Sequence, residues 1–120
     1  MEPDAVAPDG SDVFFRARGD QASLVEVRLG KGRTSHPVRH RTVEETWYFL
    51  AGRGRVWTCP PAGAGSIVEV RPGSVLVIPT GWTFQFQSDA EAELRFLCYT
   101  APPWPGDEEA EAAGPGGLES

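Results

Sequence analysis

The sequence predicts an all-β domain, and three of its features support this fold class. Its apolar residues occur in short runs of the length that β-strands have. Turn sequences rich in glycine and proline separate these runs at close spacing. No segment keeps a helical period of 3.6 residues over three turns. Eight or nine short strands in about 90 residues are typical of a sandwich, a jelly roll or a small barrel.

The turn sequences fix most of the strand boundaries. Gly-Lys-Gly follows the second expected strand, Ala-Gly-Arg-Gly the fourth and Pro-Pro-Ala-Gly-Ala-Gly the fifth. Arg-Pro-Gly follows the sixth, Pro-Thr-Gly the seventh and Ser-Asp-Ala-Glu the eighth. In chain order, the strands are expected at Asp12–Arg18, Ser23–Leu29, Thr34–His40, Glu45–Leu50, Gly54–Cys59, Ser66–Val70, Ser74–Ile78, Trp82–Gln87 and Leu94–Thr100.

Length and composition limit the chain to one domain. Its 120 residues are 40% apolar and include four Trp and six Phe, which is enough apolar area for one core. Apolar runs such as Val75–Ile78 are far shorter than the roughly 20 residues of a membrane span. Residues 1–4 lack the features of a signal peptide, so a cytoplasmic location is expected. Cys59 and Cys98 are too few for a disulfide framework, and both are expected to be buried thiols, with Cys59 the more exposed.

The negative charge of the chain lies at its two ends. Residues 1–10 carry −3 and residues 105–120 carry −5, so residues 11–104 carry +2 within the formal net charge of −6. This body has no basic stripe and no recognition helix, so nucleic-acid binding is not expected. The ends have little to bury, so residues 1–10 are expected to be a mobile tail and residues 105–120 an acidic disordered tail. Residues 11–104 are the expected β-barrel domain.

Two segments have a spacing that points to a known family. Residues 40–52 fit the pattern H-x4-E-x6-G, and residues 73–81 fit G-x5-P-x-G. In this order, with a strand-rich spacer between them, they resemble the two motifs of the cupin superfamily. Pro102–Gly106 is similar to the closing segment of small single-domain bacterial cupins. The resemblance implies a cupin-type jelly-roll β-barrel and, since many such cupins are dimers, a homodimer.

The resemblance is incomplete where cupins bind metal. A typical cupin takes three His and one Glu from these motifs, whereas here only His40 and Glu45 stand at ligand positions, with Val38 and Phe84 at the other two. His36, the remaining histidine, lies about 13 Å from His40 along an extended strand. One His and one carboxylate hold a transition metal weakly. No cofactor is therefore favoured, and a divalent transition metal held by His40 and Glu45 is the alternative.

The resemblance also places an aromatic face in the barrel interior. Alternation along Trp82–Gln87, in the family's register, turns Phe84 and its neighbours on the same face inward. The strand Gly54–Cys59 adds either Val56 and Thr58 or Arg55 and Trp57 to this interior. The residues expected to bind a flat or apolar organic molecule are Val38, Trp47, Phe49, Trp82, Phe84, Phe86 and Trp104.

His40 and Glu45 are the expected catalytic residues of such a pocket. Together they would form a proton-transfer pair, suited to acid/base chemistry without redox in an isomerase, epimerase, dehydratase or cyclase. Ten Arg against one Lys fit a GC-rich bacterial genome, with natural-product tailoring as a setting. Two alternatives stay open at this point: a metal-dependent cupin enzyme such as a dioxygenase or sugar isomerase, and a non-catalytic ligand-binding or sensing protein.

Overall fold

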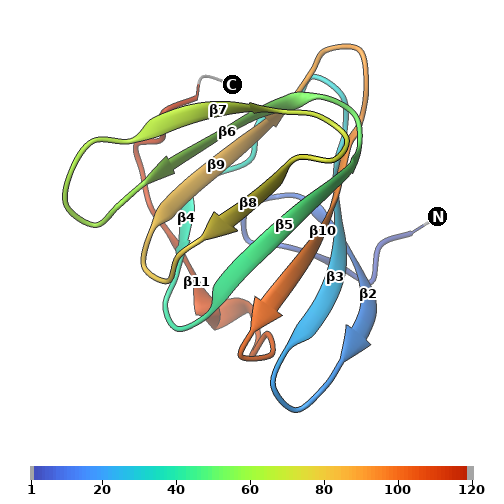
Figure 1. The fold of residues 1–120 in the computed structure, drawn as a ribbon, viewed down its shortest axis with the longest axis vertical. Helices are drawn as coiled ribbons and strands as arrows, with labels where there is room; N and C mark the ends of the chain where they lie inside the picture. The colour runs from blue at the N-terminus through green and yellow to red at the C-terminus, as the bar shows by residue number, and fades with distance from the viewer. Residues whose placement is uncertain (1, 119–120) are drawn as a thin grey trace.

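The computed structural model describes residues 2–118, which form two antiparallel β-sheets packed face to face (Figure 1). One sheet has six strands in the order β1-β2-β3-β10-β5-β8, and the other has five in the order β11-β4-β9-β6-β7. The elements are β1 (Ala5–Val6), β2 (Asp12–Arg18), β3 (Ser23–Leu29), β4 (Val38–His40), β5 (Glu44–Ala51), β6 (Gly54–Cys59), β7 (Ser66–Val70), β8 (Val75–Ile78), β9 (Thr83–Ser88), β10 (Leu94–Ala101), the 3₁₀ helix η1 (Asp107–Glu109) and β11 (Ala110–Ala112). Nothing in residues 2–118 is a helix of the length and apolarity that a bilayer crossing requires.

The all-β fold predicted from the sequence is confirmed, with most strand limits within one residue. The largest difference is in the third expected strand, which is reduced to β4, Val38–His40. Pro37 lacks the amide hydrogen that a ladder needs at this position. Before Pro37, Thr34 forms an isolated bridge with Gln87, and the amide of Ser35 donates to the carbonyl of Phe86 at 2.8 Å. The continuous strand of this segment begins at Val38.

The core lies between the two sheets and is centred on aromatic rings. Trp47 of β5 is 1% exposed and stacks on Phe96 of β10 at a centroid distance of 4.3 Å. Phe84 and Phe86 of β9 meet the Trp47 ring edge-on from the opposite sheet, at 5.3 and 5.4 Å. Such pairs add to the hydrophobic stabilisation that burial itself provides.

The structure settles which face of β6 points into the barrel. Val56 pairs with Phe86 across the ladder, and Thr58 pairs with Phe84. Directly opposed residues of an antiparallel ladder share a face, so Val56 and Thr58 face the interior. Trp57 lies on the outer face, where Gly117, near the C-terminal end of the chain, packs against its ring.

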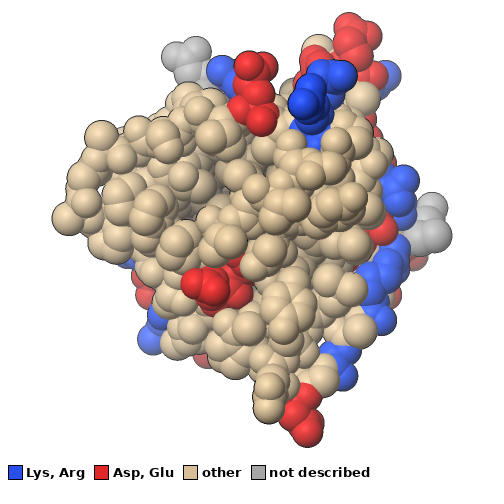
Figure 2. All heavy atoms as spheres, viewed as in Figure 1, with Lys and Arg blue, Asp and Glu red and all other residues tan. Residues whose placement is uncertain are grey.

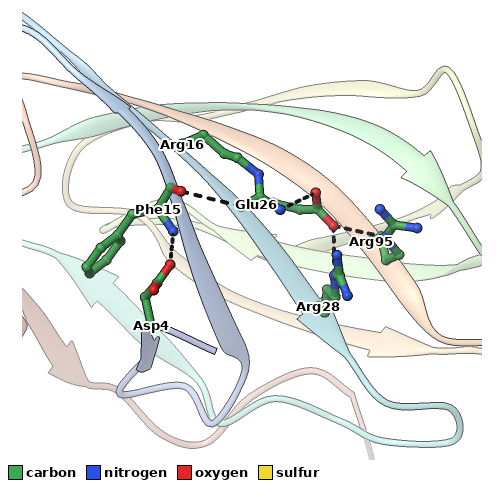
Figure 3. A network of polar contacts seen from close by, with 6 residues as sticks. All are labelled: Asp4, Phe15, Arg16, Glu26, Arg28 and Arg95. Carbon is green, nitrogen blue, oxygen red and sulfur yellow. Dashed lines mark hydrogen bonds and ion pairs between the residues drawn. The ribbon is translucent and has the colours of Figure 1, made fainter. Parts of the chain in front are cut away.

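Both ends of the chain, for which composition predicts mobile tails, pair with strands of the barrel in the structure. At the start, β1 pairs with β2, and the amide of Phe15 donates to the Asp4 carboxylate at 2.7 Å (Figure 3). At the end, β11 pairs with β4, and the amide of Leu118 donates to Gln85 Oε1 at 2.8 Å. Leu118 and Glu109 are buried. Single anchoring side chains hold these segments, and composition does not reveal such anchors.

A buried carboxylate joins the three arginines on the outer side of β2, β3 and β10 (Figure 3). Glu26 accepts hydrogen bonds from Arg28 at 2.8 Å, Arg95 at 2.9 Å and Arg16 at 3.1 Å. The Arg28 guanidinium also lies 4.3 Å from the centroid of the Phe14 ring. Burial alone would raise the pKa of Glu26, but the three arginines lower it to about 2. The cluster therefore stabilises the fold while Glu26 is ionised.

Replacing Glu26 with Gln is expected to remove a pH-dependent part of the stability. Because the folded pKa lies below the ordinary value of 4.5, the contribution is complete above pH 4.5 and is lost as the pH falls toward 2. We expect Glu26→Gln to lower the free energy of unfolding by about 1 to 2 kcal/mol at pH 7 and by less at pH 3. Urea titrations at both pH values measure this. Glu69→Gln, on an exposed position of β7, is the control, and an equal loss in both variants at both pH values would contradict the assignment.

One outer face of the barrel is poor in charge. Figure 2 shows this face, which carries β5, β8 and β10, with one acidic group near its middle and basic side chains gathered along the edge where β2 and β3 lie. The strand β8 is an edge strand of its sheet. The exposed apolar side chains on this face are Tyr48, Leu50, Val75, Val77 and Tyr99. The homodimer that the sequence analysis expects stays a prediction, and this is the surface on which we expect it.

Candidate functional site

A cavity of about 540 Å³ lies inside the barrel. Its aromatic side comes from Trp47 of β5, Phe84 and Phe86 of β9 and Phe96 of β10. The strands β2 and β3 supply more of the lining, together with residues of the N-terminal segment and the chain from Trp104 to Asp107. The volume is within the range of roughly 300 to 1,000 Å³ that small-molecule sites have. The cavity is thus large enough for a compact organic molecule.

His40 enters the cavity from the end of β4. Side chains alternate along a strand, so Val38 and His40 point inward, whereas Arg39 points outward and pairs with Glu111 at 3.1 Å. The His40 ring lies edge-on to Phe84 at 4.9 Å and to Trp104 at 5.1 Å. It is 5% exposed, and within residues 2–118 its Nδ1 atom has no hydrogen-bond partner. A buried imidazole nitrogen without a partner is uncommon in native proteins.

Glu45 lies next to His40 and is held by two hydrogen bonds. Its Oε2 atom is 3.6 Å from His40 Nδ1. The indole Nε1 of Trp47 donates to Oε1 at 2.8 Å, and the hydroxyl of Thr100 donates to Oε2 at 3.2 Å. These bonds orient the carboxylate, while the gap to His40 is slightly longer than a hydrogen bond. A small movement of either side chain would let a proton pass between the two residues.

The loop that joins His40 to Glu45 is fixed from the C-terminal end of the chain. The carboxylate of Glu109 accepts hydrogen bonds from the Thr42 hydroxyl at 2.6 Å and from the Val43 amide at 2.9 Å, and it also accepts one from the Thr42 amide. Burial tends to raise the pKa of Glu109, but the bonds from Thr42 and Val43 outweigh it and lower the pKa. Glu109 is therefore ionised, and it holds the turn on which the site is built.

Five of the residues predicted to bind a ligand line the cavity. They are Val38, Trp47, Phe84, Phe86 and Trp104. His40 and Glu45, the predicted catalytic pair, also line it. Their catalytic and binding roles stay predictions.

Two predicted binding residues lie elsewhere. Phe49 is fully buried in the core, with its ring 4.9 Å from that of Phe96, and it is not part of the cavity lining. Trp82 also lies outside the lining. It belongs to the turn before β9, which begins at Thr83, so the alternation of side chains along the strand does not apply to it. Its amide donates to the carbonyl of Pro79 in the preceding turn. The predicted strand began one residue too early.

The sequence analysis missed an acidic residue of the cavity. Asp9 is 9% exposed and lines the cavity, and its Oδ1 atom accepts hydrogen bonds from the amide of Ser11 at 2.8 Å and from its hydroxyl at 2.6 Å. The sequence Pro8–Ser11 reads Pro-Asp-Gly-Ser, which is a turn signature. That signature could have shown that residues 1–10 contain an ordered turn, but it does not show that the turn faces the interior.

A thiol and a hydroxyl of β10 belong to the polar lining. Cys98 and Thr100 of β10 both line the cavity, and their Sγ and Oγ1 atoms are 3.6 Å apart. Burial raises the pKa of the Cys98 thiol, and the nearby Glu45 carboxylate raises it further. Cys98 is therefore a neutral thiol, which is a poor nucleophile. Cys59 and Cys98 are both free.

The side chains present do not fit a tightly bound metal ion. At the four positions that correspond to cupin metal ligands, His40 and Glu45 carry donor atoms, whereas Val38 and Phe84 carry only carbon. No cluster of three His, Cys, Asp or Glu side chains within residues 2–118 is arranged to hold a metal. Zinc and non-haem iron sites take at least three protein ligands. We therefore derive no step through a metal.

Comparisons with known proteins identify the fold. A protein from Klebsiella pneumoniae, described as having a double-stranded β-helix domain, superposes with a TM-score of 0.71 at 12% identity, over 88% of this chain and 85% of that one. KdgF from a Halomonas species gives 0.70 at 18% identity, over 85% and 88%. The oxalate decarboxylase of Lactobacillus farciminis gives 0.73 at 21% identity, over 85% of this chain and 31% of the enzyme. The chain therefore has the double-stranded β-helix fold of the cupins, as its sequence predicts.

The comparisons by sequence are less informative. No family model matches the chain. An uncharacterized protein of Methanocaldococcus jannaschii is 28% identical over 87 residues, which are 72% of this chain and 66% of the relative. The chain thus spans just under two thirds of that relative. The role of the cavity has to be argued from its own geometry.

Proposed function

We propose that this protein binds a small organic molecule in its barrel and acts on it as a metal-independent acid/base enzyme of the isomerase, epimerase, dehydratase or cyclase type. The observation that carries the proposal is the His40–Glu45 pair, with its 3.6 Å separation, on the wall of a largely apolar cavity of about 540 Å³. A cytoplasmic location is part of the same proposal.

The lining of the cavity supports a ligand that is mainly apolar. Aromatic rings on one side offer flat surfaces for stacking and edge contacts. Two arginines of β2, Arg16 and Arg18, also line the cavity, but both are exposed, whereas His40 and Glu45 are buried. A few polar groups on an apolar wall are what orients a bound substrate in most small-molecule sites.

The pair itself supports proton transfer. Trp47 and Thr100 hold the Glu45 carboxylate in place, and the His40 Nδ1 atom has no competing partner within residues 2–118. A positioned acid/base pair of this kind contributes roughly 10²- to 10⁴-fold to a proton-transfer step. Among solved proteins of this fold, the oxalate decarboxylases are enzymes, which supports an enzymatic role without indicating the reaction.

Blocking the cavity tests the binding site. The probe is 2-naphthol, a flat neutral molecule, titrated against the intrinsic tryptophan fluorescence, because Trp47 and Trp104 line the cavity. Val13 lines the cavity, so Val13→Trp is expected to fill it and weaken binding at least tenfold. The matched control Val75→Trp, on the exposed face of β8, is expected to leave the affinity within twofold.

Three outcomes decide the proposal. Equal binding by Val13→Trp and by the unmodified protein would place the ligand outside the barrel and overturn it. A large change in 2-naphthol affinity after exhaustive chelation would favour the metal-dependent alternative. Binding that responds to Val13→Trp and not to chelation supports the metal-independent site, and Glu45→Gln then separates an enzyme from a binding protein once a turnover assay is in hand.

A further inference from the structure

The N-terminal turn brings Asp9 into the same cavity as His40 and Glu45. The amide of Gly10 donates to the carbonyl of Ala7 at 2.8 Å and closes a β-turn with Asp9 at its third position. The amide of His36 donates to the carbonyl of Asp9 at 2.8 Å and fixes the turn from the β3–β4 connection. The chain is thus held where a carboxyl group points at an apolar cavity and not at water.

Backbone geometry and hydrogen bonds leave this turn little freedom. Gly10 has φ +94°, in the region that glycine adopts readily, and a Cβ there would lie 3.4 Å from the His36 ring. The amide of Ala7 donates to the carbonyl of Ser11 at 2.9 Å, so both ends of the turn are also tied together. Asp9 is therefore in a fixed position in the structure.

Only one oxygen of Asp9 is used by the turn. Oδ1 accepts both hydrogen bonds from Ser11, whereas Oδ2 accepts none from the described residues. An asparagine could form the same turn without burying an ionisable group. The second oxygen is therefore available to a molecule in the cavity.

The surroundings of Asp9 shift its pKa upward. Burial raises its pKa, the two bonds from Ser11 lower it, the charge of Glu45 raises it further, and His40 lowers it. The net direction is upward. A neutral carboxylic acid is a hydrogen-bond donor, and in a dry cavity it can stabilise negative charge that develops on a substrate oxygen.

We propose that Asp9 is a third catalytic residue of this cavity, whose carboxylic acid donates a hydrogen bond to the carbonyl oxygen of a neutral carbonyl compound while the His40–Glu45 pair removes the proton on the adjacent carbon. This inference rests on the proposed function and adds to it the class of substrate. A ketone or similar neutral carbonyl compound fits, because the buried part of the cavity combines an apolar wall with Asp9, His40 and Glu45, while Arg16, Arg18 and Asp107 of the lining are exposed.

The step is an enolisation in which atoms and electrons balance. The C–H bond next to the carbonyl breaks, and its proton goes to the His40–Glu45 pair. The electrons of that bond form a carbon–carbon double bond, the carbonyl π electrons move onto the oxygen, and the oxygen takes the proton of Asp9. Return of a proton from the His40–Glu45 pair to the other face or to another carbon gives an epimer or an isomer, while the enol O–H proton goes back to Asp9. No oxidant or reductant takes part.

Hydrogen–deuterium exchange of a model ketone tests the inference. The probe is 2-tetralone in D₂O, with loss of its α-proton signals followed by proton NMR, and 2-naphthol binding is measured in parallel. The unmodified protein is expected to accelerate exchange, and Glu45→Gln is expected to abolish the acceleration. Asp9→Asn keeps an oxygen for Ser11, so it is expected to fold and to bind 2-naphthol within threefold while exchange slows about 10- to 100-fold.

Ser11→Ala is the matched control, because it removes a bond to Asp9 and keeps the acid. Slow exchange by Asp9→Asn together with exchange by Ser11→Ala within fivefold of the unmodified protein supports a catalytic role. If Asp9→Asn fails to fold, Asp9→Glu, which keeps the acid but moves it, replaces it; at least a fivefold loss of exchange then supports the role, and exchange within twofold overturns it. Exchange by Asp9→Asn within twofold of the unmodified protein would overturn the role of Asp9. An equal loss in Ser11→Ala would assign Asp9 to the turn alone and overturn it too. If 2-naphthol binds in the barrel but the protein does not accelerate exchange of 2-tetralone, this inference fails and the proposed binding site stands. If 2-naphthol does not bind, the proposed function itself fails.

Discussion

Replacing Trp47 with Ala is expected to lower the free energy of unfolding by about 3 to 5 kcal/mol. The Trp47 ring is 1% exposed, stacks on Phe96 and meets Phe84 and Phe86 from the other sheet. Its removal leaves a cavity between the sheets that the surrounding rings can fill only in part. The carboxylate of Glu45 also loses the indole donor that holds it at 2.8 Å. Urea unfolding followed by circular dichroism measures the loss.

Two further variants separate packing from hydrogen bonding at this position. Trp47→Phe keeps a ring between Phe96 and Phe84 but removes the indole donor, so we expect it to lose less stability than Trp47→Ala. Trp82→Ala is the size-matched control, since Trp82 is only half-buried before β9 and is expected to cost about 1 kcal/mol or less. A Trp47→Ala loss no greater than that of Trp82→Ala would show that the two sheets do not depend on this contact.

The fold could be predicted because its signals are local. A strand such as Gly54–Cys59 is bounded by turn residues and needs no distant partner to be recognised. The face of this strand that points into the barrel could not be predicted. Alternation shows that every second side chain lies on the same face, but it does not show which face is inside. Pairing of Val56 with Phe86 on β9 decides that side, and this pairing is a long-range property of the sheet.

The site could be predicted only in part, for a similar reason. The spacing of His40 and Glu45 lies within one stretch of chain, so their meeting at 3.6 Å follows from a short loop between β4 and β5. Asp9 and Glu109 reach the same region from opposite ends of the chain. Their charge and their glycine-rich or acidic surroundings are typical of solvated tails. What fixes them is a small number of specific hydrogen bonds that no composition encodes.

Truncation after Trp104 tests whether the C-terminal segment is a solvated tail, as its composition predicts, or is anchored to the barrel, as in the structure. An acidic tail without contacts could be removed at no cost, whereas the structure predicts a loss of about 3 to 6 kcal/mol in the free energy of unfolding. Burial of Leu118 accounts for roughly 1.5 to 3 kcal/mol of this, and the hydrogen bonds that Glu109 makes to Thr42 and Val43 account for a similar amount. Urea titration of the truncated and full chains measures the difference.

Point variants then locate the effect at the loop that carries the site. Glu109→Gln keeps one acceptor oxygen but removes the charge, so it is expected to cost about 1 to 2 kcal/mol and to weaken 2-naphthol binding, because the turn between His40 and Glu45 loosens. Glu108→Gln, the exposed neighbour, changes the net charge equally and is expected to have no effect on either measurement. Equal stability of the truncated and full chains, with equal stability and 2-naphthol binding in Glu109→Gln and Glu108→Gln, would contradict this prediction. The segment would then be a disordered tail, as its composition predicts, and the barrel alone would hold the turn that positions His40 and Glu45.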